Sequence, residues 1–258
     1  MLFTKRRKFV LASIILSLGL LVTQLVSQEW RYGVIAGISA LSGILALWAL
    51  YQDLKGIGWG ISLVLPVLYP TAVALFYFLL PEKALTRTVI LILFGIGMYA
   101  IFLTENIFVV ASLRTIQLAR AAQAVGFLFT LLIAFFLFDT IFSFKLAGWW
   151  NAGLVLVTSF PLVLHGVWSV DLSDRLPEKL WIYAAGLAIG MGQLALMISF
   201  WPVSIVVASL FLVTGLYVGL GLMQHQLGER LFQQTIREYV QVGVIVLIVT
   251  FIAARWGG

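Results

Sequence analysis

The chain has 258 residues, of which 62% are hydrophobic and 10% are charged. Soluble domains contain about 45–50% apolar and about 25% charged residues, so this chain has too few polar residues to cover a soluble protein of its size. The composition excludes a soluble enzyme, a disordered chain and a nucleic-acid-binding domain. It predicts a polytopic membrane protein that lies in a lipid bilayer and has no nucleic-acid partner.

The first apolar run, residues 9–26, follows the basic cluster Lys5-Arg6-Arg7-Lys8. A basic segment before an apolar one is also typical of a secretory signal. This run is longer than the apolar part of such a signal, and no cleavage site of the A-x-A type follows it. We therefore interpret the run as an uncleaved first membrane span.

Further apolar runs, each about the length of a membrane span, follow along the chain. They are too long and too uniformly apolar for barrel strands. We therefore predict an all-α, polytopic transmembrane helical bundle of about nine spans, forming a single transmembrane domain over residues 1–258 with no soluble domain. The alternative is eight spans, with one apolar run re-entrant or interfacial. The predicted spans after the first are about 32–50, 60–80, 88–103, 122–142, 149–170, 180–200, 203–223 and 239–254.

The tryptophans and the charges both fit this division. Tryptophan favours the membrane interface because its ring is apolar and its N–H needs a polar partner. Eleven of the 16 lysines and arginines fall in segments that are cytoplasmic if the N-terminus is inside, so the positive-inside rule favours that orientation. The nine tryptophans all fall at predicted span ends: Trp30, Trp48, Trp59, Trp149, Trp150, Trp168, Trp181, Trp201 and Trp256.

Two polar stretches interrupt this pattern. Residues 224–238 have apolar side chains on one side and charges elsewhere, which predicts an amphipathic helix lying on the membrane surface. Thr104-Glu105-Asn106 interrupts an apolar stretch that resumes at Ile107. Either the span ends at Leu103 and a half-buried helix follows, or the span continues past Glu105.

Ionisable groups inside a membrane are costly, so each is a candidate functional residue. Glu105, with Asn106 beside it, is a candidate proton- or cation-binding carboxylate, although an ion pair with Arg114 or Arg120 would also explain it. Asp139 could line a vestibule, or lie at the interface with Lys145 as its partner.

Pro161 and His165 are one turn apart in a predicted span, and Thr158 lies near them. Proline kinks a helix because it lacks an N–H group, so the three residues together predict a small polar cavity. Haem ligation by His165 and His225 is conceivable, but a buried structural His165 and a solvated His225 explain the pattern better. We predict no cofactor and no metal site.

Arg114, Gln117, Arg120 and Gln123 recur every three residues, which predicts a polar ridge on one helix face. Arginine forks suit phosphate or carboxylate groups, including lipid headgroups. Ordinary anchoring at the inner membrane surface is the alternative.

Two spans share the pattern G-L-x-[IV]-G-[ML]-G. Small residues four apart let helices approach closely in lipid, so we predict a helix-packing role for these glycines. They are Gly186, Gly190, Gly192, Gly215, Gly219 and Gly221.

The segment 104–127, TENIFVVASLRTIQLARAAQAVGF, resembles a segment of uncharacterised multi-spanning inner-membrane proteins of small-genome candidate bacteria. The resemblance implies a multi-pass protein of a bacterial inner membrane. It implies no activity and no catalytic residue.

Three functions remain from the sequence. The first is a transporter or permease-like protein for a small or lipidic solute, with a cavity near Glu105, Pro161 and His165. The second is a non-catalytic scaffold or assembly subunit with a membrane-protein partner. The third is an enzyme acting on a lipid-linked phosphate, which ranks last because no paired-carboxylate or metal motif accompanies the arginines.

Overall fold

Helices make up the described part of the chain, which comprises residues 4–23, 26, 28–51, 58–80, 84–112, 117–173 and 177–255 of a computed structural model. No strand occurs among these residues, so the predicted all-α bundle is confirmed. The chain divides into two compact units, residues 1–129 with 172–175 and residues 130–171 with 176–258. Each unit is described by itself, and the single transmembrane domain stays a prediction.

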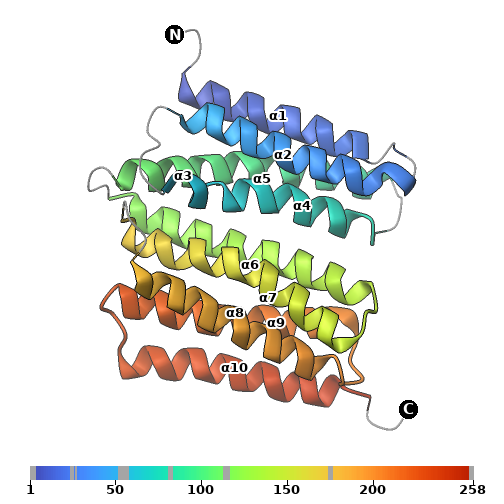
Figure 1. The fold of residues 1–258 in the computed structure, drawn as a ribbon, viewed down its shortest axis with the longest axis vertical. Helices are drawn as coiled ribbons and strands as arrows, with labels where there is room; N and C mark the ends of the chain where they lie inside the picture. Colours follow the sequence, from blue (N-terminus) through green and yellow to red (C-terminus); the bar gives the residue numbers. More distant parts are fainter. Residues whose placement is uncertain are drawn as a thin grey trace. The chain divides into compact units, whose positions relative to one another are not determined.

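Unit 1 contains the helices up to the first half of α6 (Figure 1). Helix α1 packs against α2 and α5, and α2 and α5 both contact α4. The bounds are α1 Lys5–Thr23, the 3-10 helix η1 Gln28–Trp30, α2 Arg31–Leu50, α3 Gly58–Ile61, α4 Val64–Tyr77, α5 Ala84–Ala111 and α6 Ala119–Ser143.

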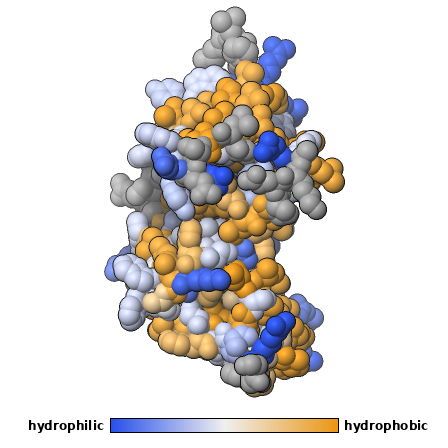
Figure 2. All heavy atoms as spheres, turned by 90° about the vertical axis from the view of Figure 1, so that its right-hand side faces the viewer, coloured by the Kyte–Doolittle hydropathy of each residue, from blue (hydrophilic) through white to orange (hydrophobic). Residues whose placement is uncertain are grey.

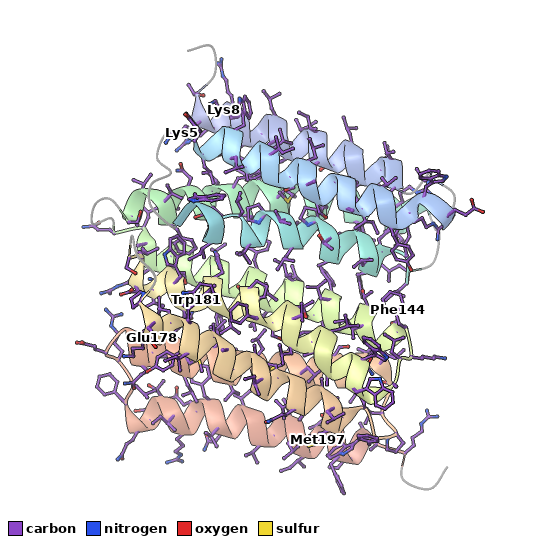
Figure 3. All side chains as sticks on the ribbon, in the orientation of Figure 1. Lys5, Lys8, Phe144, Glu178, Trp181 and Met197 are labelled. Atoms are coloured by element: carbon purple, nitrogen blue, oxygen red, sulfur yellow. The ribbon has the colours of Figure 1, made fainter. Side chains whose placement is uncertain are left out.

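Unit 2 contains the second half of α6 and the remaining helices (Figure 1). Helices α7, α8 and α9 pack against one another, and α10 packs against α9. Glu178 and Trp181 lie at one end of these helices, and Phe144 and Met197 lie at the opposite end (Figure 3). The bounds are α7 Gly148–Asp171, α8 Glu178–Ile198, α9 Ile205–Leu227 and α10 Gln233–Ala253.

Within the described residues, eight helices are long and apolar enough to cross a membrane, with α3 and α4 counted as one candidate span, Gly58–Tyr77. These are the helices of a multi-pass membrane protein. Helix α1 is not among the eight, because its first turn carries the cluster of Lys5, Arg6, Arg7 and Lys8. This number matches the alternative prediction of eight spans. The helix left out of the eight is α1, however, and the reason is its basic first turn and not a re-entrant path.

The break between α3 and α4 follows from Pro66. A proline ring clashes with the carbonyl of the residue four positions earlier, and proline donates no hydrogen bond to it. That residue is Ser62, and the helix is interrupted at Ser62 and Leu63. Pro70 likewise leaves the Pro66 carbonyl without its helical donor, and the Ser42 hydroxyl of α2 donates to that carbonyl over 2.6 Å. The prolines thus shape both this span and its contact with α2.

The tryptophans lie near helix ends as predicted, apart from Trp256, which is outside the described residues. Trp149 and Trp150 are exposed at the start of α7, as interfacial residues would be. Trp168 differs, because its ring is 1% exposed and belongs to the packed interior. Figure 2 shows one end of the helices, where hydrophilic and hydrophobic side chains are interspersed.

The predicted surface helix over residues 224–238 is wrong. Helix α9 continues to Leu227 and α10 begins at Gln233, so only a short turn lies between them. Glu229 has a φ of 54° there, and Arg230 N donates to His225 O over 2.9 Å. A residue in the left-handed region stops a helix, and the polar residues are divided between the ends of two spans.

Candidate functional site

Helix α5 runs without interruption through Thr104, Glu105 and Asn106 to Ala111. The prediction in which the span continues past Glu105 is therefore confirmed, and the one in which it ends at Leu103 is wrong. A membrane span needs about 20 residues, and the central twenty residues of α5 are 88–107. The carboxyl group of Glu105 thus belongs to the spanning part of the helix.

Glu105 lies on the buried face of α5 and is 0% exposed. The spacing of three and four residues along this face is that of one stripe on a helix. Most of this stripe is apolar, and the buried Thr104 hydroxyl, which donates to Ala100 O over 2.9 Å, lies next to Glu105 on it. The stripe consists of Phe94, Met98, Ile101, Phe102, Thr104, Glu105, Phe108 and Val109.

A glycine of α6 allows that helix to approach α5 beside Glu105. A Cβ atom at Gly126 would lie 3.2 Å from two ring carbons of Phe108 and 3.6 Å from Cγ2 of Thr104. Asn106, next to Glu105, has a buried Oδ1 atom without a hydrogen-bond partner among the described residues. Two buried polar groups, the carboxyl group of Glu105 and the Oδ1 atom of Asn106, therefore follow one another on α5.

The predicted arginine ridge is described only in part. Arg114 lies outside the described residues, whereas Gln117 and Arg120 are exposed. Helix α6 begins at Ala119, so Gln117 precedes the helix and shares no helix face with Arg120. Within the described residues Arg120 forms no ion pair, so it does not neutralise Glu105.

Asp139 is the second buried carboxylate and lies on the part of α6 that belongs to unit 2. Its Oδ1 atom accepts a hydrogen bond from the Ser209 hydroxyl of α9 over 3.4 Å. Within the described residues no ion pair joins Asp139 to Lys145, which is exposed in the turn after α6. Asp139 is thus a polar contact between two helices of unit 2.

Pro161 and His165 lie in α7, which is helical from Gly148 to Asp171 with Pro161 inside it. His165 is 1% exposed, and its ring centroid is 6.3 Å from that of Trp168. The Thr158 hydroxyl donates to Leu154 O of its own helix over 2.8 Å. Thr158, Pro161 and His165 therefore lie on one helix, as predicted from their spacing. The part of this helix from residue 162 to residue 169 is buried on all sides.

The predicted packing glycines divide into two sets. Gly192 faces α7, with Ala152 O at 3.1 Å from its would-be Cβ atom, whereas Gly215 and Gly219 of α9 receive leucine side chains of α8. Gly186 and Gly190 have no neighbour within 4 Å of that position, so their packing role stays a prediction.

An aromatic cluster between α9 and α10 was not predicted. The ring of Tyr239 lies directly on Gly221, its centroid is 5.0 Å from that of Tyr217, and it also meets His225 at 5.7 Å. Gly221 was the available signal, although the sequence did not say which helix it would face. His165 and His225 therefore have separate aromatic neighbours.

The candidate residues belong to two different units, so the predicted cavity near Glu105, Pro161 and His165 stays a prediction. Glu105 and Asn106 belong to unit 1, whereas Asp139, Pro161 and His165 belong to unit 2. Among the described residues, no three histidine, aspartate or glutamate side chains come together as a metal site. The best candidate for a functional group is the carboxyl group of Glu105, because it is fully buried on a mainly apolar face of α5.

Residues 48–253 match the family model for a protein of unknown function, DUF5656. No curated protein and no solved structure gives a significant match to the chain. The match includes the whole segment 104–127, but it carries no statement on organism or membrane, so the bacterial inner-membrane setting stays a prediction.

Proposed function

Because the chain belongs to the DUF5656 family, whose description gives no activity, we propose a function from its own chemistry: a transporter of small solutes coupled to proton or cation binding at Glu105. The observation that carries this proposal is the complete burial of Glu105 on the apolar face of a spanning helix. Ionisable residues in such positions are costly and typically belong to ion pathways and proton relays.

The surroundings of Glu105 support a binding group that changes its charge. A buried carboxylate is costly to keep ionised, whereas a protonated or cation-bound carboxyl group is tolerated there. Asn106, the next residue of α5, has a buried amide oxygen without a hydrogen-bond partner among the described residues. The carboxyl group of Glu105 is thus where a proton or cation would bind and be released.

Proton movement driven by a solute tests this function. Purified protein would be reconstituted into liposomes loaded with the pH indicator pyranine, and single solutes would be added outside. The panel contains amino acids, sugars, nucleosides and carboxylates. We expect at least one class to change the internal pH with the wild-type protein, and Glu105→Gln to abolish that change.

The matched control is Glu178→Gln, because Glu178 is exposed in the first turn of α8. It removes the same charge from a solvated position and should leave the signal unchanged. Glu105→Asp should retain part of the signal, since it keeps a carboxyl group. No solute-driven pH change with wild-type protein, or the same change with Glu105→Gln, would contradict the proposal.

We also propose the predicted orientation, with the N-terminus inside, in a bacterial inner membrane. The basic first turn of α1 supports a cytoplasmic start by the positive-inside rule. The enzyme alternative gains no support from the described residues, because Gln117 and Arg120 are exposed and share no helix face. A scaffold role is supported by one observation, the exposed face of α10, from which the next inference starts.

A further inference from the structure

Helix α10 is the least covered of the candidate spans. Only 6% of its apolar window is buried, compared with at least 33% for each of the other seven. Its main contacts are with α9, its Phe251 ring also meets that of Trp201 before α9, and Thr250 is its only buried residue. The residues turned toward α9 are the less exposed ones, at 235, 239, 243, 246 and 250.

The opposite face of α10 has the spacing of a helix–helix contact. Its centre is formed by exposed residues separated alternately by three and four positions, which is the repeat of a coiled-coil seam. We call this set the outer seam, and it consists of Gln234, Arg237, Gln241, Val244 and Ile248. Glu238 lies beside it, next to Arg237.

The polar part of the outer seam lies within the spanning length of the helix. Twenty residues counted back from Ala253, the last residue of α10, begin at Gln234. Tyr239 is level with Gly221 of α9, which is inside the uncharged run 205–223. Arg237 and Glu238 are within about 3 Å of that level along the axis, and Gln241 is about 3 Å farther into the span.

These side chains have little protein around them. Glu238 Oε1 accepts a hydrogen bond from Gln234 Nε2 over 3.1 Å, and neither Arg237 nor Glu238 forms an ion pair with a described residue. Together with Gln233 and Gln241 they line a hollow of about 610 Å³ on the outside of α10. Polar groups facing lipid are costly, and they are satisfied by contact between helices.

We propose that the outer seam of α10 binds a second copy of the chain. In a two-fold symmetric pair of parallel helices, the same patch meets itself. Arg237 of each copy then lies beside Glu238 of the other, which forms two symmetric ion pairs and fills the hollow. Val244 and Ile248 continue the contact as an apolar seam toward the other end of the span.

The opposite charges on adjacent residues favour this partner. A lipid headgroup with a single charge would complement Arg237 or Glu238 but not both, whereas a second copy complements both charges and also brings Gln234 and Gln241 against their own copies. The inference does not depend on transport, because it concerns unit 2 alone and uses neither Glu105 nor its surroundings.

Disulfide crosslinking tests the proposal, since the chain contains no cysteine of its own. Single variants Gln241→Cys, Val244→Cys and Ile248→Cys would be oxidised in native membranes with copper phenanthroline. We expect a crosslinked dimer from each. The matched controls Thr235→Cys and Val246→Cys face α9 and should give several-fold less.

A charge exchange tests the ion pairs in the Ile248→Cys background. Arg237→Glu or Glu238→Arg alone places like charges opposite each other and should weaken dimerisation about threefold to thirtyfold. The double variant restores opposite charges and should restore crosslinking. Arg230→Glu, in the exposed turn before α10, should have no effect.

Any one of three results would overturn the proposal. The first is equal crosslinking at the seam and control positions, and the second is crosslinking only to other polypeptides. The third is failure of the double charge exchange to restore the dimer in a variant that remains monodisperse by size-exclusion chromatography. The cysteine variants leave Arg237 and Glu238 in place, so a folding defect of the charge variants does not affect the first test.

Discussion

Gly166→Ala should destabilise unit 2, because Gly166 of α7 lies against the Leu220 side chain of α9. A new Cβ atom would be 2.8 Å and 2.9 Å from the two δ-carbons of Leu220 and 3.3 Å from its γ-carbon. Carbon atoms in favourable contact are about 3.5–4.0 Å apart. Leu220 has no exposed surface, so its side chain has no free space into which to move.

The expected magnitude combines two opposing effects. Overpacking a buried contact costs about 1–3 kcal/mol, while alanine in place of glycine inside a helix gains about 0.5–1 kcal/mol. The net loss is about 0–2.5 kcal/mol, which for a chain of this size lowers Tm by up to about 10 °C. A shift of α9 would also stretch the 2.9 Å hydrogen bond from Gln224 Nε2 to Gly166 O.

Thermal unfolding in detergent micelles, followed by tryptophan fluorescence, measures this loss. The matched control is Gly153→Ala in the same helix, where a Cβ atom meets nothing within 4 Å, so only the helix-propensity gain remains and Tm should not fall. Leu220→Ala should make Gly166→Ala harmless, because the two changes are in direct contact. Equal Tm values for Gly166→Ala and Gly153→Ala would refute this reasoning about the α7–α9 contact.

Two further predictions concern the α2–α4 contact and the membrane orientation. Ser42→Ala should lower the free energy of unfolding by about 0.6–2 kcal/mol, since it leaves the buried Pro66 carbonyl without the Ser42 donor. Ser62→Ala, which removes a buried hydroxyl that has no hydrogen bond among the described residues, should cost nothing in the same denaturation assay. For the orientation, an impermeant maleimide added to whole cells should label Phe144→Cys but not Gln226→Cys, since Phe144 lies in the turn after α6 and Gln226 in the last turn of α9, at opposite ends of unit 2. The reverse labelling would place the N-terminus outside.

The helices were predictable because the signal for a membrane span is strong and local. A run of about 20 apolar residues needs no knowledge of its neighbours, and each predicted run corresponds to a helix or, for residues 60–80, to the pair α3 and α4. The interruption in that pair also has a local cause in Pro66. Helix ends were less predictable, because Glu105 and residues 224–226 are polar residues that remain helical.

The candidate site was predictable only as separate residues. Glu105, Asp139 and His165 were identified because charge and imidazole are rare in apolar runs, and the structure buries all three. Their neighbours depend on which helix faces which, and that depends on packing over the whole chain. Asp139 meets Ser209 instead of Lys145 for this reason, and Gly221 meets Tyr239 of α10 instead of α8.

The hydrogen bond between Ser42 and Pro66 has a consequence for biogenesis. Inserted alone, α4 would carry a carbonyl into the bilayer for which its own helix has no donor, because Pro70 cannot supply an N–H group. The missing donor belongs to α2, which the ribosome synthesises first. Helix α4 therefore reaches the membrane when its hydrogen-bond donor on α2 is already available there.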